Sequence, residues 1–255
     1  MDSNSNPEPL TADLPVATGP FPGVTRRQTA FTFRKRRRCI QLPLPNGVDL
    51  TSLAGQAVML LIDDSGSMFM PGADKDGLRY TAAASVADLL RRLDVAALGV
   101  VHWGSYCPAD LTLRPTTPMN VRGVDMALRA PASPLGGTNL SAALQYAHAV
   151  AQLDVPHLMP NYLVITDGLE SVGRSLEKTL AILPSRSVRV LLVDRAKKCD
   201  HHTEQRWRSL PLSAFLRLDA NDPDEWAWAA AVALFANLQT AYPHLPGQTQ
   251  RKYLW

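Results

Sequence analysis

Short apolar runs alternate with longer amphipathic stretches from about residue 55 onward. Runs that are apolar almost throughout are typical of parallel strands covered on both faces. They occupy residues 57–63, 95–103, 161–166, 187–194 and 213–219. Amphipathic stretches between and after them, with apolar residues at helical spacing, predict helices. These lie at residues 78–93, 139–153, 174–183, 203–210 and 222–242. The alternation predicts an α/β fold with a doubly wound, mostly parallel sheet and helices on both faces.

The composition is that of a globular protein with ample material for a core. Hydrophobic residues make up 46% of the 255 and charged residues 19%, with a mean hydropathy of -0.08. The 3 cysteines are odd in number and form no CxxC pair, which favours free thiols in a reducing compartment. The first residues do not resemble a secretory signal, and no apolar run is long enough to cross a membrane. We therefore expect a cytoplasmic protein.

The net charge of +3 is concentrated at the amino-terminal end. Residues 1–50 hold 7 of the 26 Lys/Arg and 4 of the 23 Asp/Glu, so the remainder holds 19 of each. We expect a disordered or extended basic arm at 1–50, one domain at 51–242 and a carboxy-terminal tail at 243–255. The basic run at 34–38 could attract nucleic acid or an acidic protein surface, or be solvated. A nucleic-acid role is disfavoured because the rest of the chain is not basic.

Three oxygen-rich loops follow the predicted strands or precede a predicted helix. "DDSGS" contributes Asp63, Ser65 and Ser67, "LGGTNL" contributes Thr138, and "TDG" contributes Asp167. Because the carboxyl ends of parallel strands meet at one edge of a sheet, these loops are expected to converge. Hydroxyl and carboxylate oxygens without His or Cys suit a hard cation such as Mg²⁺. Two carboxylates balance the charge of such an ion, which leaves it able to take one more anionic oxygen.

In this order, the three motifs resemble the metal-ion-dependent adhesion site (MIDAS) of the von Willebrand factor A (vWA) domain, whose first motif is Asp-x-Ser-x-Ser. The resemblance covers about residues 55–240. It implies direct ligation by Ser65, Ser67 and Thr138, with Asp63 and Asp167 acting directly or through water. The implied cofactor is Mg²⁺, with Mn²⁺ or Ca²⁺ as alternatives.

In that family, a partner protein commonly supplies an Asp or Glu to the metal. The resemblance therefore implies a non-enzymatic, intracellular adaptor or scaffold of bacterial type. The partner would be a protein, in the setting of an AAA+ ATPase system or a stress or defence complex. Neither nucleic acid nor a membrane is an expected partner.

The same residues allow a second interpretation, as the site of a hydrolase. Ser65 or Ser67 with His102 and Asp167 could form the nucleophile, base and orienting acid of a hydrolase. No Gly-x-Ser-x-Gly elbow supports this, and His102, at the end of an apolar run, is more typical of a structural histidine. Asp64 occupies the variable position of the motif; we expect it to be solvated or to lie outside the ligand shell, and its role stays open.

Two further clusters favour structural explanations. Cys199, His201 and His202 lie close in sequence, but adjacent histidines diverge and no second cluster completes a zinc site. Trp226 and Trp228 are expected to be packing residues. Being two positions apart on a helix, they are not both expected to face the core.

Overall fold

A five-stranded parallel sheet forms the centre of the molecule. The computed structural model describes residues 30–35, 38–43, 51–74, 76–93, 95–168, 176–194, 201–219, 222–235 and 252–254, with backbone only for the first two ranges and the last. The sheet has the order β4-β3-β5-β6-β7, and all four pairings are parallel. Its strands are β3 (Ala57–Asp63), β4 (Ala97–Trp103), β5 (Pro160–Thr166), β6 (Val188–Val193) and β7 (Ala214–Leu218).

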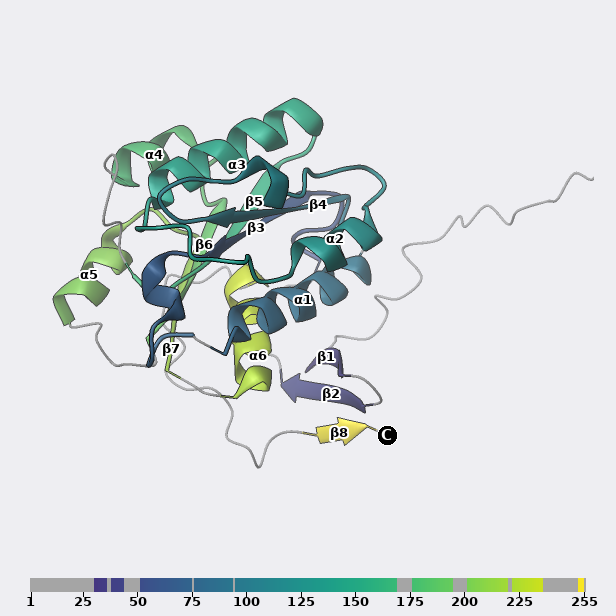
Figure 1. Ribbon diagram of the computed structural model, residues 1–255. Helices are drawn as coiled ribbons and strands as arrows, with labels where there is room; N and C mark the ends of the chain where they lie inside the picture. The colour runs from purple at the N-terminus through teal and green to yellow at the C-terminus, as the bar shows by residue number, and fades with distance from the viewer. Residues whose placement is uncertain are drawn as a thin grey trace, which may run out of the picture.

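Helices cover both faces of this sheet, so the predicted fold class is confirmed. Figure 1 shows α3 and α4 on one side of the strands and α1 and α6 on the other. The helices are α1 (Leu78–Arg91), α2 (Val121–Ala127), α3 (Leu140–Asp154), α4 (Leu176–Ile182), α5 (His201–Ser209) and α6 (Pro223–Phe235). Every residue of β3, β4, β5 and β6 is buried, as the continuous apolar runs predicted.

Successive residues of β3 point to opposite faces of the sheet. Val58, Leu60 and Ile62 belong to the core beneath α1 and α6. Met59 and Leu61 belong to the core beneath α3 and α4. The same alternation governs the two aspartates that follow, and it sends them to different environments.

The strand order creates a topological switch point at the carboxyl ends of β3 and β5. In the sheet, β3 and β5 are neighbours. The chain leaves β3 toward β4 on one side, and it leaves β5 toward β6 on the other side. Ligands of open α/β sheets bind at such a switch point, outside the carboxyl ends of the strands. The ends of β3 and β5 carry two of the three motifs identified in the sequence.

Two features of the helices differ from the sequence predictions. The helix α2 was not predicted; it contains Gly123, and the side chain of Asn120 caps it by accepting a hydrogen bond from the Gly123 amide (2.9 Å). The expectation that Trp226 and Trp228 would not both be buried is wrong, because they are 0% and 3% exposed. Helix α6 contacts the sheet, α1 and β1, so more than one of its sides faces protein.

A second, antiparallel sheet joins residues from near the two ends of the chain. It pairs β1 (Ala30–Lys35) with β2 (Arg38–Pro43), and β2 with β8 (Lys252–Leu254). Strand β1 lies beside α1 and α6. The side chains of the basic run lie outside the described residues, and the boundaries at residues 50 and 243 stay predictions. Of the helices that the structure describes, none has the length and apolarity needed to cross a membrane.

Small residues allow α1 and α6 to pack closely, which leads to the first prediction. Ala230 is 0% exposed within the core shared by these helices. We expect Ala230→Leu to lower the free energy of unfolding by about 1–3 kcal/mol, because added methyl groups in a filled core force neighbours apart. Urea denaturation would measure this. Ala84→Leu, at an exposed position of α1, is the control, and an equal effect of both substitutions would contradict the prediction.

Candidate metal centre

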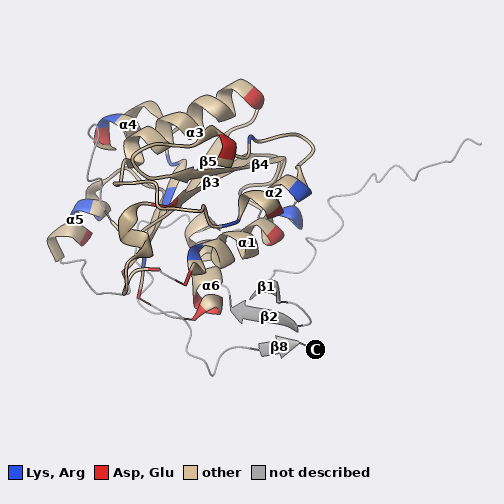
Figure 2. Cartoon of the chain, in the orientation of Figure 1, with Lys and Arg blue, Asp and Glu red and all other residues tan. Residues whose placement is uncertain are grey.

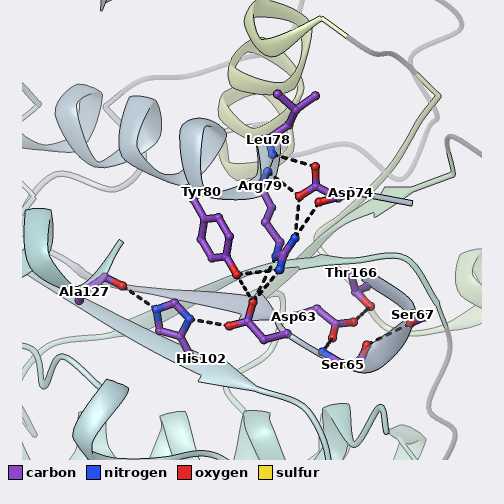
Figure 3. A network of polar contacts seen from close by, with 11 residues as sticks. Asp63, Ser65, Ser67, Asp74, Leu78, Arg79, Tyr80, His102, Ala127 and Thr166 are labelled. Carbon is purple, nitrogen blue, oxygen red and sulfur yellow. Dashed lines mark hydrogen bonds and ion pairs between the residues drawn. The ribbon is translucent and has the colours of Figure 1, made fainter. Parts of the chain in front are cut away.

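The side chain of Asp63 anchors the site at the end of β3. It is completely buried. Its Oδ1 accepts a hydrogen bond from the Ser65 amide (2.8 Å) and its Oδ2 accepts one from the Thr166 hydroxyl (2.5 Å). Figure 3 shows these contacts between the first motif and the end of β5. The carboxylate is therefore held by two neutral donors, one from its own loop and one from the adjacent strand.

A chain of polar contacts links the first and third motifs. The hydroxyls of Ser65 and Ser67 lie 3.1 Å apart, and the Ser67 hydroxyl donates to Oδ1 of Asp167 (2.9 Å). A 3-10 turn, η1 (Gly66–Phe69), carries Ser67 directly after the strand. Ser65 is buried, Ser67 is exposed and Asp167 is half-buried, so the chain runs from the protein interior to its surface.

The loop that carries Thr138 packs against the first motif. The Gly66 amide donates to the Gly136 carbonyl (2.7 Å), and Thr138 itself is 6% exposed. Gly136 has a φ of +86°, and a Cβ there would lie 2.7 Å from the Ser105 hydroxyl oxygen. A side chain at this position would therefore strain the backbone and displace the Ser105 hydroxyl, which accepts a hydrogen bond from the Gly137 amide (2.6 Å). All three predicted motifs meet at one end of the sheet.

Burial raises the pKa of the Asp63 carboxyl to about 7, and the nearby charge of Asp167 adds a smaller increase. The hydrogen bonds from Thr166 and Ser65 act in the opposite direction. Among the described residues, no Lys or Arg forms an ion pair with Asp63. A cation would compensate its charge, and five oxygen donors without nitrogen or sulfur fit a hard divalent ion. The five predicted residues therefore suit the proposed metal.

Asp64 points to the opposite face of the sheet and is also completely buried. Of the two alternatives for this residue, solvated or outside the ligand shell, the solvated one is therefore wrong. Its Oδ1 accepts hydrogen bonds from Arg79 Nε (3.2 Å), Arg79 Nη2 (3.0 Å) and the Tyr80 hydroxyl. Its Oδ2 lies 2.6 Å from His102 Nδ1. Figure 3 shows the side chains of Arg79, Tyr80 and His102 pointing toward the oxygens of one carboxylate. Asp64 thus has charged and polar partners, whereas Asp63 has only neutral ones.

Sequence reasoning missed Arg79, although the pattern of α1 contains a signal for it. Arg79 lies three, four and seven residues before Ala82, Ala83 and Val86, all of which are buried. It therefore occupies the apolar stripe of the helix. A charged residue on a buried stripe requires a buried partner of opposite charge, and Asp64 and Asp74 fill that role.

The geometry of His102 bears on the hydrolase interpretation. One ring nitrogen faces Asp64, and the other lies 2.5 Å from the Ala127 carbonyl oxygen. Both nitrogens are therefore engaged away from Ser65 and Ser67, and His102 has the structural role that the sequence favoured. A Ser–His pair at the first motif is not present in this arrangement.

The remaining alternatives fall partly outside the described residues. Cys199 is not described, and the part of the chain that is described holds no group of three or more His, Cys, Asp or Glu side chains suited to a metal.

Cys107 is a free thiol, and burial raises its pKa to about 11. Figure 2 shows that α1, α4 and α5 each carry both acidic and basic residues.

Comparisons with known proteins bear on the fold. No family model matches the sequence, and no curated protein matches it. The pilus adhesin SpaC from Lactobacillus rhamnosus GG is similar in structure, with 14% identity and a TM-score of 0.52 over 77% of this chain and 31% of that one. This likeness shows a shared fold.

Other similar structures are more distant by TM-score. A von Willebrand factor type A protein from Catenulispora acidiphila has 15% identity and a TM-score of 0.49, over 76% of this chain and 43% of that one. Proximal thread matrix protein 1 from the mussel byssus, solved with a zinc-occupied MIDAS motif, has 15% identity and a TM-score of 0.47, over 71% and 47%. The present chain thus spans less than half the length of each of these three solved chains.

The raised pKa of Asp63 predicts how pH affects the metal-free protein. Between the ordinary Asp pKa near 4 and about 7, the folded protein binds more protons at this site than the unfolded chain does. Stability is therefore lost as pH rises through this window, by a few kcal/mol at most. We expect Asp63→Asn to remove this loss in EDTA, so that the variant melts at a higher temperature than the wild type at pH 8.

Thermal melts from pH 4.5 to 8 would measure the difference between the two proteins. Asp110→Asn, which changes an exposed carboxylate, is the control and should keep the wild-type pH dependence. Parallel wild-type and Asp63→Asn curves would refute the assignment of this pKa to Asp63.

Proposed function

We propose that this chain is a metal-dependent protein-interaction module. Mg²⁺ would be held by Asp63, Ser65, Ser67, Thr138 and Asp167, and a carboxylate of a partner protein would complete its coordination. The observation that carries the proposal is the contact chain from Ser65 through Ser67 to Asp167. It brings hydroxyl and carboxylate oxygens from two distant motifs together at the switch point of the sheet.

The resemblance of the motifs implies different tasks for the five residues. Ser65, Ser67 and Thr138 would bind the ion through their hydroxyls, while Asp63 and Asp167 would balance its charge directly or through water. Ser67 is exposed and Asp167 is half-buried, so a partner would reach the site from their side. The ion, when bound, would supply a Lewis-acidic centre that attracts an anionic oxygen.

Charge favours Asp or Glu on the partner. Two carboxylates neutralise a divalent ion, and three hydroxyls add no charge. Mg²⁺ prefers six oxygen ligands in near-octahedral geometry, so an ion at this centre would retain an affinity for a further carboxylate oxygen. Mn²⁺ accepts the same donors, and Ca²⁺ would require more ligands.

The biological setting is part of the proposal and derives from the resemblance of the motifs alone. We propose a cytoplasmic adaptor or scaffold of bacterial type that makes and breaks no covalent bond. Its partner would belong to an AAA+ ATPase system or to a stress or defence complex. The engagement of both His102 ring nitrogens supports a binding role over hydrolysis.

Metal binding is the first consequence to test. Isothermal titration of the metal-free protein with Mg²⁺ and with Mn²⁺ should give one site. Ser67→Ala should weaken it by at least about tenfold, since changes outside the ligand shell already weaken metal sites by that much. Ser85→Ala is the matched control, because the Ser85 hydroxyl donates to a backbone carbonyl within α1. This substitution should leave the Mg²⁺ affinity unchanged. Absence of binding by the wild type would exclude the metal site.

Partner binding is the second consequence to test. Proteins captured from the source cell by the immobilised chain in Mg²⁺ should be released by EDTA and should not be captured by Ser67→Ala. Carbodiimide amidation of the partner, which neutralises its carboxylates, should abolish capture because the metal would lose its ligand. Capture that survives both chelation and amidation would argue against a metal-bridged contact.

A further inference from the structure

The segment of residues 64–74, termed here the metal loop, carries Ser65 and Ser67 and begins and ends with a buried aspartate. Asp64 and Asp74 are both 0% exposed. Arg79, whose side chain forms ion pairs with both of them, is 1% exposed. We infer that Arg79 is a positioning residue for the metal centre, because it clamps the two ends of the metal loop together. The inference rests on the proposed metal function and assigns a role to a residue outside the predicted ligand set.

Arg79 holds the first residue of the loop from the face of the sheet opposite Asp63. Its Nε and Nη2 atoms donate to Oδ1 of Asp64 at 3.2 and 3.0 Å. Asp64 is the residue between two predicted ligands, Asp63 and Ser65. A displacement of its side chain would therefore move both of them.

Arg79 also holds the last residue of the loop. Its Nη1 atom donates to Oδ2 of Asp74 (2.9 Å) and to the Asp74 carbonyl (3.1 Å). The Asp74 carboxylate accepts in turn from the amides of Leu78 (2.7 Å) and Arg79 (3.0 Å), which fixes it to the first turn of α1. The end of the loop is therefore held at the start of α1 by two backbone amides and by the Arg79 guanidinium.

The middle of the loop contacts the same group. The Arg79 guanidinium carbon lies 4.7 Å from the centre of the Phe69 ring, and such a stacked cation stabilises the ring's position. Phe69 belongs to the turn that carries Ser67. Arg79 thus contacts the start, the middle and the end of the metal loop.

The backbone of Asp64 extends this effect to the loop that carries Thr138. Its amide donates to the Trp103 carbonyl, and its carbonyl accepts from the Leu135 amide, both at 2.7 Å. Leu135 opens the loop that leads to Thr138. Holding Asp64 in place consequently ties the metal loop to the end of β4 and to the loop that carries Thr138.

Arginine suits this position better than lysine. Its planar guanidinium presents five N–H donors in a fixed fork, so it can bind two carboxylates and a carbonyl at once. A lysine ammonium is a point charge on a flexible stem and would balance charge without fixing both ends of the loop. Without any cation, two buried carboxylates would lack compensation.

The test measures the clamp and its consequence separately. In metal-free protein, Arg79→Met and Arg79→Lys should speed hydrogen exchange at the amides of Met68, Met70 and Asp74, which are hydrogen-bonded within the loop. Calorimetry with Mg²⁺ should then give at least about tenfold weaker binding for Arg79→Met and an intermediate loss for Arg79→Lys. If Arg79→Met does not fold, Arg79→Lys carries the test.

Arg91→Met is the matched control, because it makes the same change on the same helix. Arg91 pairs with Asp125 at 2.5 Å and should affect neither measurement. Wild-type exchange and wild-type Mg²⁺ affinity in Arg79→Lys would overturn the inference. Failure of the wild type to bind Mg²⁺ would instead overturn the proposed function, while the exchange measurement would still decide whether Arg79 clamps the loop.

Discussion

The alternation of side chains at the end of β3 determines the chemistry on both faces of the sheet. It sends Asp63 to one face and Asp64 to the other, and both are fully buried. An ionised carboxylate in a protein interior must be paired with a cation or neutralised. Asp64 is paired with Arg79, whereas Asp63 has only neutral donors and a raised pKa. Within the described part of the chain, the fold therefore provides a cation for the charge of Asp64 but none for the charge of Asp63, although the two aspartates are adjacent in sequence.

The neighbouring helix and strand supply the hydrogen-bond donors of the two aspartates. Helix α1 begins just after Gly77, whose φ of +71° suits glycine, and its first turn places Arg79 beside Asp64. Strand β5, next to β3 in the sheet, delivers Thr166 to Asp63. The strand order is thus what makes a carboxylate, three hydroxyls and a second carboxylate available at one edge. The helix start on the opposite face supports the same loop from behind.

The parts of this arrangement that sequence predicted are those encoded by local pattern. The continuous apolar run ending at Asp63 marked a buried strand, and its polar end marked the edge of the sheet. The pattern of α1 marks Arg79 as a charged residue on a buried stripe, but it does not identify the partner of Arg79. Asp64, Arg79 and His102 are distant from one another in sequence, so only the fold shows that they form one network. Trp226 and Trp228 were misjudged for a related reason: helical spacing gives the angle between two side chains, but not how many sides of a helix are covered.

The difference between the two aspartates also separates folding from metal binding. The partners of Asp64 are supplied wholly by the chain, so this buried charge is compensated with or without an ion. The charge of Asp63 is compensated only by a proton or by an ion. The hydrogen bonds that Arg79 makes to Asp64 and Asp74 do not involve the ion. The metal loop can therefore bind and release the ion without unfolding. A site that depends on a partner requires reversible metal binding. The two aspartates fit this requirement, because Asp64 is compensated by the chain and Asp63 is left for the ion.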